Sequence, residues 1–328
     1  MKGKIKINKV FVKRMIQLAC IIVFIFSAKS IIKYQLMTKS TRDNQKNLAK
    51  IYETSQTSTP ESSKEPEATP QVSAPPVKVV FTDPPQAPKK ASIHDKATLI
   101  PENKKEPVIT ATPEPAMSDK FVSLYRINDD VKGWLKLNSV HGVDFPVVHK
   151  DNEFYLNRDF YQKHNAGGTA FLDVECSILP KSDNLIIHGH NMKNGTMFGK
   201  LYTLLNLETL KSDPFAYFDT LYEQGVYVPY SVSVVSLNPK DANYASIYET
   251  NFSGDEAKAF YINELRSLSY FNFPIDVSPR DELLTLITCH GGNNEQRLVV
   301  AYRRLRSNEN QAELLEHIRN NTQLSGKK

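Results

Sequence analysis

The chain has few cysteines, and they do not form a disulfide framework. Its 328 residues include three cysteines, Cys20, Cys176 and Cys289. Cys20 lies inside an apolar N-terminal run, so at most one disulfide can form in the rest of the chain. An extracellular protein with so few cysteines either works without bridges or keeps a thiol for chemistry.

The chain also lacks a positive excess beyond its N-terminus. Its formal net charge is +5, but residues 1–14 hold six Lys and Arg and no acidic residue. Subtracting these six charges leaves the remainder of the chain near −1. No large basic surface is implied, so nucleic acid is not an expected partner.

The longest apolar run, residues 15–28, is short for a membrane span, which needs about 20 residues. Neighbouring apolar residues extend it to 15–34 if the flanking lysines reach the interfaces. We expect an uncleaved single-pass signal-anchor in the cell membrane. The lysines of residues 1–14 predict that the N-terminus is cytoplasmic and that the rest of the chain is extracellular. A cleaved signal peptide is the alternative, with Ala28-Lys29-Ser30 as a weak cleavage pattern.

Residues 35–115 contain little that could be buried. Twelve of the 19 prolines lie between Thr59 and Ala116, among Ser, Thr, Lys and Glu. This composition predicts a disordered extracellular spacer that lifts the next domain off the membrane. The folded domain is expected at 116–308, with a C-terminal helix and tail at 309–328.

Many short β-branched runs and a few isolated helices make up the folded domain. This pattern favours a mainly β fold, a barrel or sandwich with helical insertions. One such helix follows Ser253, which forms a capping box with Glu256. The apolar residues of this helix are expected on one face; they are Ala257, Phe260, Tyr261, Leu265 and Leu268.

Three reactive side chains stand at predicted strand ends. Two apolar runs, Leu283–Cys289 and Leu298–Tyr302, flank turn residues at 291–294, as in a hairpin. Cys289 and Arg297 then face each other at the end of that hairpin. His190 ends another apolar strand, Asn184–His190. A thiol, an imidazole and a guanidinium in this arrangement suggest nucleophilic acyl transfer.

Several motifs between Phe121 and Leu305 together resemble a class B sortase. They are Asn128-x-Asp130 with Gly133-Trp134, Asp151-Asn152 with Tyr155-Leu156, Phe171-Leu172-Asp173, Gly189-His190-Asn191-Met192 with Thr196-Met197-Phe198, and Thr285-Leu286-Ile287-Thr288-Cys289 followed by Arg297. The resemblance implies a closed sortase-type β-barrel of about eight strands, with N-terminal helices and an extra helix before the cysteine strand.

The resemblance also implies an activity. A cysteine transpeptidase would cleave an LPxTG/NPxTN-like C-terminal sorting signal after Thr through a thioester. It would then join the secreted protein to an amine of cell-wall precursor or a pilin, without cofactor or metal. The implied catalytic residues are Cys289, His190 and Arg297. The implied oxyanion and substrate-binding residues are Thr288, Asn152, Leu156, Ile287 and His188.

Two other functions fit some of the same residues. A Cys/His protease would use the same thiol and imidazole but only hydrolyse its substrate. A zinc-binding surface protein would use His188, His190, Cys289 and His290 as ligands. Adjacent residues of a strand point to opposite faces, which disfavours the pair Cys289 and His290 as joint ligands.

Overall fold

The computed structural model describes residues 9–57, 115–290 and 293–327. The helix at residues 9–57 belongs to the same compact unit as the C-terminal domain. The residues between them, 58–114, lie outside the described residues, and so does most of the predicted spacer. The turn residues Gly291 and Gly292 lie outside them as well.

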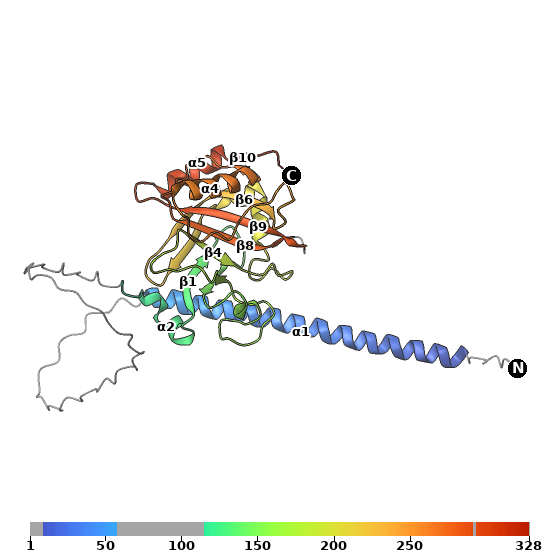
Figure 1. Cartoon of the computed structure of the whole chain (residues 1–328). Helices are drawn as coiled ribbons and strands as arrows, with labels where there is room; N and C mark the ends of the chain where they lie inside the picture. Colours follow the sequence, from blue (N-terminus) through green and yellow to red (C-terminus); the bar gives the residue numbers. More distant parts are fainter. Residues whose placement is uncertain (1–8, 58–114, 291–292, 328) are drawn as a thin grey trace, which may run out of the picture. The chain divides into compact units, whose positions relative to one another are not determined.

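A closed barrel forms the centre of the fold, with neighbouring strands in the order β1-β2-β3-β4-β8-β9-β6-β5 (Figure 1). Its strands are β1 Val131–Lys136, β2 Asp144–Val148, β3 Phe171–Leu172, β4 Asn184–His188, β5 Ala216–Thr220, β6 Val226–Ser236, β8 Leu283–His290 and β9 Asn293–Arg304. Two short strands, β7 Phe271–Asn272 and β10 Gln323–Leu324, form a separate sheet. The predicted mainly β barrel of about eight strands is confirmed.

Two of the helices precede the first strand along the chain, and the others lie between strands. They are α1 Lys9–Thr57, α2 Asp119–Ile127, α3 Leu207–Ser212, α4 Asp255–Leu268 and α5 Gln311–Asn321, with 3-10 turns η1 Phe154–Leu156 and η2 Leu201–Leu205. The expected extra helix before the cysteine strand is α4, which packs on β6 (Figure 1). Its N-cap is Gly254 and makes no side-chain cap bond, so the predicted Ser253 capping box is wrong.

The cysteine strand β8 is buried on both faces, which explains its unbroken apolar sequence. Every residue from Leu283 to Thr288 is buried. The one hydroxyl in its middle, Thr285 Oγ1, donates to Asn184 Oδ1 at 2.9 Å and lies 3.3 Å from the Tyr261 hydroxyl. The strand is therefore held on both sides, and its C-terminal end has a fixed position.

Strand directions bring three chain segments to one edge of the barrel. β4 runs parallel to β8, with His188 opposite Ile287. β9 runs antiparallel to β8, with Cys289 opposite Arg297. The carboxyl ends of β4 and β8 and the start of β9 therefore meet at the same edge.

The prediction of a disordered spacer from residue 35 is wrong for residues 35–57, which continue α1 and pack on the domain. Four buried residues form the contact stripe: Thr38, Thr41, Leu48 and Tyr52. They recur at helical spacing on one face. Two of the four are threonines, and hydrogen bonds take the place of apolar contacts there: Asn194 Nδ2 donates to Thr38 Oγ1 at 2.7 Å, and Asn165 Nδ2 donates to Thr41 Oγ1 at 2.9 Å.

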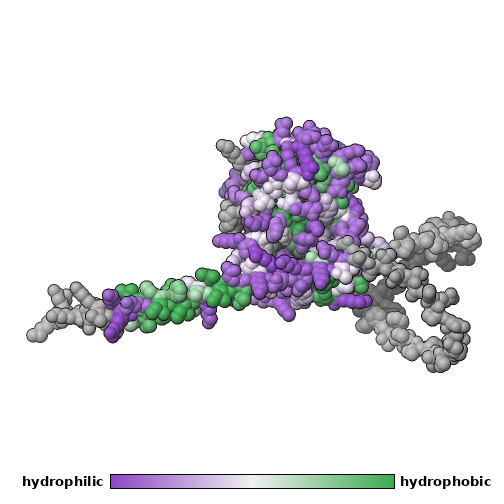
Figure 2. Space-filling view, turned by 180° about the vertical axis from the view of Figure 1, so that it is seen from behind, coloured by the Kyte–Doolittle hydropathy of each residue, from purple (hydrophilic) through white to green (hydrophobic). Residues whose placement is uncertain are grey.

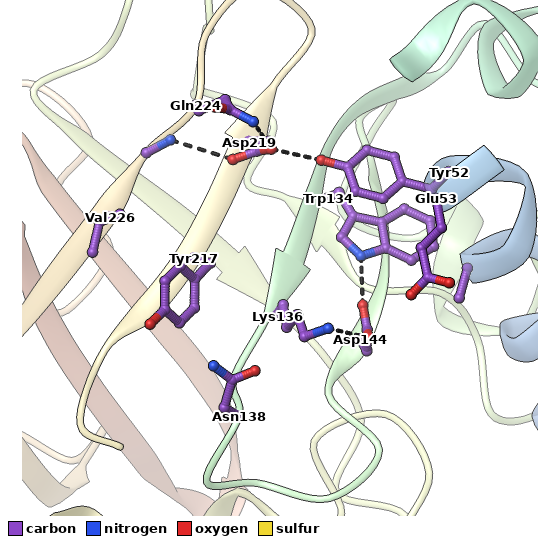
Figure 3. A pocket seen from close by; sticks show the side chains of 12 residues that line it. Tyr52, Glu53, Trp134, Lys136, Asn138, Asp144, Tyr217, Asp219, Gln224 and Val226 are labelled. Carbon is purple, nitrogen blue, oxygen red and sulfur yellow. Dashed lines mark hydrogen bonds and ion pairs between the residues drawn. The ribbon is translucent and has the colours of Figure 1, made fainter. Parts of the chain in front are cut away.

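Tyr52 fixes the C-terminal end of α1 on the barrel (Figure 3). Its ring stacks on Trp134 of β1, with centroids 4.5 Å apart and planes within 4°. Its hydroxyl donates to Asp219 Oδ2 at 2.6 Å. Burial, reinforced by the bond to Asp219, raises the pKa of Tyr52, so the hydroxyl keeps its proton and remains a donor.

The N-terminal half of α1 is apolar and exposed, unlike the docked C-terminal half. It includes an 18-residue window of mean hydropathy 2.2, none of which is buried in the structure. Figure 2 shows these apolar side chains exposed along the helix; Phe24 and Phe26 are 74% and 72% exposed. By length and composition this part of α1 is able to cross a membrane.

Candidate functional site

A cavity of about 470 Å³ opens at the barrel edge where β4, β8 and β9 meet. Every predicted site residue lines it: Cys289, His190, Arg297, Thr288, Asn152, Leu156, Ile287 and His188. Six further residues complete the wall: Phe171, Asp173, Val174, Glu175, Gly189 and Tyr248. The eight predicted residues come from four places: η1 and the loop before it, β4 and the residues after it, β8, and β9. The barrel therefore brings together side chains that are more than a hundred positions apart in the sequence.

Cys289 lies at the C-terminal end of β8 and is partly exposed in this cavity. Its backbone carbonyl accepts a hydrogen bond from Asn191 Nδ2 at 2.8 Å. Asn191 directly follows His190, so this bond ties the loop that carries the imidazole to the strand that carries the thiol. The thiol is accessible while its backbone is fixed, as a nucleophile requires.

His190 is held by a backbone group. Its Nε2 lies 2.7 Å from the carbonyl oxygen of Leu156. A carbonyl oxygen only accepts hydrogen bonds, so Nε2 carries a hydrogen in both the neutral and the charged ring. The other ring nitrogen, Nδ1, is then the position that gains and loses a proton. The Leu156 carbonyl sets both the tautomer and the orientation of this imidazole.

Arg297 stands directly opposite Cys289 in the β8–β9 ladder. One of its guanidinium nitrogens, Nη1, donates to the carbonyl of Gln296 at 3.1 Å. The guanidinium lines the cavity together with the thiol. A fixed positive charge in this place can stabilise negative charge on an oxygen or on sulfur.

Thr288 and Ile287 support the cavity from β8. The Thr288 hydroxyl donates to the Gly189 carbonyl at 2.7 Å, and the Gly189 N–H donates to the Ile287 carbonyl at 3.2 Å. These two bonds continue the β4–β8 pairing to the residue before His190. The side chain of Thr288 is thus occupied in bracing the site, and its contribution to an oxyanion would come from the backbone.

Asn152 and His188 meet on the carboxylate of Asp173. His188 Nε2 lies 2.8 Å from Asp173 Oδ2, and Asn152 Nδ2 donates to the same oxygen at 3.1 Å. Asn152 Oδ1 accepts the Val174 N–H at 2.9 Å. Burial opposes ionisation of Asp173, but the bonds from His188, the Glu175 N–H and Asn152 outweigh it, so the pKa of Asp173 is lowered. The carboxylate stays charged and fixes this wall.

Two residues of the cavity wall, Asp173 and Tyr248, were not predicted from the sequence to be functional. Asp173 stood in a recognised motif, but its link to His188 depends on a strand pairing. Tyr248, whose ring lies 6.0 Å from that of His188, follows β6 in an irregular segment with no periodic signal. Leu156 adds an aliphatic side chain, 39% exposed, at the cavity mouth.

Cys176 has a structural environment instead of a reactive one. It is 3% exposed, and its sulfur accepts the Ile186 N–H at 3.2 Å. Burial raises the pKa of the Cys176 thiol to about 12. This thiol stays protonated near neutral pH, so Cys289 is the cysteine suited to nucleophilic chemistry in the barrel.

The zinc alternative has no support from the geometry. Within residues 9–57, 115–290 and 293–327, no group of three or more His, Cys, Asp and Glu side chains is close enough to hold a metal ion. His188, one of the proposed ligands, has its Nε2 on Asp173.

Comparisons with known proteins agree with this arrangement. The family model described as the sortase domain matches residues 135–304, just over half of the chain. Sortase B of Staphylococcus aureus is 32% identical over 184 residues, which are 55% of this chain and 72% of that protein. Sortase B of Listeria monocytogenes is 29% identical over 172 residues, covering 52% and 67%. A structure of the S. aureus sortase B–substrate complex superposes with a TM-score of 0.53 at 27% identity, covering 58% of this chain and 87% of that one.

A closed barrel with a thiol, an imidazole and a guanidinium around one cavity defines a cysteine enzyme built on a β-barrel. The chain belongs to the sortase family, within which it is a class B member. The resemblance predicted from the motifs is thereby confirmed. Membership in this class makes the chain a cysteine transpeptidase of the kind that anchors proteins to the cell wall.

Proposed function

We propose that this chain is a single-pass membrane enzyme that cleaves an LPxTG/NPxTN-like C-terminal sorting signal after its Thr. The observation that supports this best is the convergence of Cys289, Arg297 and the carbonyl-held His190 on one cavity. The acceptor is an amine of cell-wall precursor or a pilin. The apolar half of α1 would anchor the chain, with residues 1–14 in the cytoplasm and the barrel outside.

In the first half-reaction, the Cys289 sulfur adds to the carbonyl carbon after Thr and forms a tetrahedral oxyanion. Arg297 and backbone N–H groups near Thr288 stabilise that oxyanion. The C–N bond then breaks, and His190 Nδ1–H gives its proton to the departing amine. The products are a thioester on Cys289, the released C-terminal fragment and a neutral imidazole.

In the second half-reaction, an acceptor amine adds to the thioester carbon and gives a proton to His190 Nδ1. Collapse of the intermediate breaks the C–S bond, forms the new amide and returns Cys289 as a thiolate beside a protonated imidazole. The Leu156 carbonyl keeps Nε2 protonated throughout, so a single nitrogen handles both transfers.

Product analysis with the full-length chain in detergent tests this proposal. A library of peptides with varied sorting motifs is incubated with and without an added amine, and products are identified by mass spectrometry. The expected result is cleavage after Thr and, with the amine, a joined peptide. Hydrolysis alone at saturating amine would support the Cys/His protease instead. The full chain is preferred because α1 covers part of the barrel.

A further inference from the structure

A second cleft, of about 670 Å³, lies between α1 and the barrel at the β1–β2 turn and the loop after β4. Three basic side chains line it from two sides: Arg42 and Lys46 from α1, and Lys200 from the barrel. His141 of the β1–β2 turn also faces it. None of the catalytic residues lines this cleft, and it is separate from the cavity around Cys289.

The cleft holds more positive charge than its carboxylate can balance. Asp144 is the one acidic residue in its lining. That carboxylate is already occupied, since Oδ1 accepts from Trp134 Nε1 at 2.6 Å and Oδ2 lies 3.1 Å from Lys136 Nζ (Figure 3). Within the part of the chain that the structure describes, Arg42, Lys46 and Lys200 form no ion pair with a carboxylate.

Contacts with the fold position two of these cations, Arg42 and Lys200. Arg42 Nη2 donates to the Asn194 carbonyl at 3.0 Å, and the Asn194 side chain in turn donates to Thr38 of α1. The stem of Lys200 lies against Gly195, where an added Cβ would come within 2.9 Å of Lys200 Cε. Glycine here gives the lysine its path along the turn. Like charges held across one cleft repel, and an anion between them removes that cost.

We propose that this cleft binds a phosphate group of an anionic phosphodiester polymer. The planar fork of Arg42 and the point charges of two lysines suit a multi-oxygen anion better than a single carboxylate. Lys39 and Lys50 extend the cationic row of α1 beyond the cleft at helical spacing, so that Lys39, Arg42, Lys46 and Lys50 span about 16 Å. Such a row matches a chain of several phosphates.

The position of the cleft along α1 favours a polymer over a lipid headgroup. Arg42 lies eight residues, or about 12 Å of helix, beyond residue 34, where the predicted membrane span ends. The headgroup layer is roughly 5–8 Å thick on each side of a bilayer. This step rests on the proposed membrane anchor, whereas the charge argument does not.

Binding of a synthetic glycerol-phosphate oligomer to the full-length chain in neutral detergent tests the proposal. We expect binding that weakens as salt rises, and that falls by roughly tenfold or more in Arg42→Gln/Lys46→Gln. Lys200→Met, which keeps the stem on the barrel side, should weaken it as well. Lys163→Gln/Lys240→Gln changes the net charge equally outside the cleft lining and should bind like the parent.

Three outcomes would overturn the proposal. The first is no salt-dependent binding, and the second is equal binding by the cleft variants and the control. The third is tighter binding of dihexanoyl phosphatidylglycerol than of the oligomer, which would identify a lipid headgroup as the occupant. Peptide cleavage by the same samples reports on Cys289 separately, so failure of the polymer proposal and failure of the proposed transpeptidation are distinguishable.

Discussion

A backbone carbonyl orients the imidazole of His190, so the chemistry of the site depends on where η1 lies. Leu156 ends that 3-10 turn, and the same residue offers its side chain to the cavity. Any peptide that packs on the Leu156 side chain therefore also contacts the element that fixes the His190 tautomer. If the proposed roles hold, Leu156 would couple substrate binding to proton transfer by His190.

Removing the Cys289 sulfur tests the nucleophile directly. Cys289→Ala should lower the rate of peptide cleavage by more than about a thousandfold, because no thioester can form. Cys176→Ala is the matched control and should cleave at close to the parental rate, since that thiol is buried and protonated. Mass spectrometry of the trapped acyl-enzyme should find the added mass on the Cys289 peptide; finding it on Cys176 would refute the assignment.

The Asp173 carboxylate should control substrate binding more than chemistry. Asp173→Asn removes the negative charge that His188 and Asn152 share, and its NH2 group cannot accept the Glu175 N–H that bonds the other carboxylate oxygen. Loss of one charged hydrogen bond predicts a KM increase of roughly five- to thirtyfold with a smaller change in kcat. Steady-state kinetics on one peptide would show this split; an equal loss in kcat at unchanged KM would place Asp173 in the chemical step instead.

At the scale of single residues, the motifs were a good guide to which side chains gather. All eight residues taken from them line one cavity. The contact between the Leu156 carbonyl and His190 could not be predicted, because any residue type can make a backbone contact. Nor could it predict Tyr248, which reaches the wall from an irregular segment.

Among the elements, α1 shows how a few polar contacts replace an apolar face. Its docked stripe contains only two large apolar residues, Leu48 and Tyr52, so hydrophobic periodicity could not reveal it. The α4 helix shows the opposite error. Phe260, expected on its buried face, is 70% exposed. The buried residues of α4 centre on Tyr261 and Leu265, with Phe260 more than about 100° away around the helix.

Replacing Tyr52 measures how firmly α1 is docked. Tyr52→Ala removes the ring from Trp134 and should lower the free energy of unfolding by about 3–5 kcal/mol. Tyr52→Phe keeps the stacking and loses only the bond to Asp219, so we expect about 1 kcal/mol. Chemical denaturation of the full chain in detergent gives both values. Equal values near zero would mean that α1 does not stabilise the barrel.

For the molecule as a whole, the ion pairs of one buried and two partly exposed carboxylates predict its response to acid. Burial alone would raise the pKa of Asp281, but bonds from Arg306 and Ser278 outweigh it and lower that pKa. The pKa values of Glu223 and Glu282 are also lowered, because both carboxylates bond to Lys181 and Arg304. A lowered folded-state pKa stabilises the fold above the ordinary carboxyl pKa of about 4. That stability is lost as the pH falls through the lower folded-state values.

Melting temperatures between pH 7 and pH 2.5 test this response. The melting temperature of the parent should be nearly constant down to about pH 5 and should then fall progressively as the pH is lowered further. Arg306→Gln removes two hydrogen bonds to Asp281, at 2.8 and 2.7 Å. Its melting temperature should be lower than that of the parent at pH 7 and should approach the parental value near pH 2.5. Lys240→Gln serves as the control. A deficit for Arg306→Gln that stayed constant with pH would exclude the ion pair as its cause.

The docking of α1 also changes what residues 58–114 are expected to do. The sequence favoured a spacer between membrane and enzyme, but α1 itself carries the candidate membrane span and reaches the barrel as one helix. Tyr52 of α1 lies 5.4 Å, ring to ring, from Phe121 of α2. The two helices are therefore neighbours, and the chain between them both leaves and returns to the same compact unit.

We therefore expect that replacing residues 59–114 by a Gly/Ser linker of about ten residues leaves the barrel intact. The shortened chain should unfold at the same denaturant concentration as the parent and cleave peptide at the same rate, because no described contact is removed. Tyr52→Ala should lower the free energy of unfolding by the same amount in the shortened chain as in the parent. If the segment were the tether, α1 would have to detach in the membrane-bound enzyme, and the shortened chain would lose activity toward a cell-surface substrate while keeping it toward a soluble peptide.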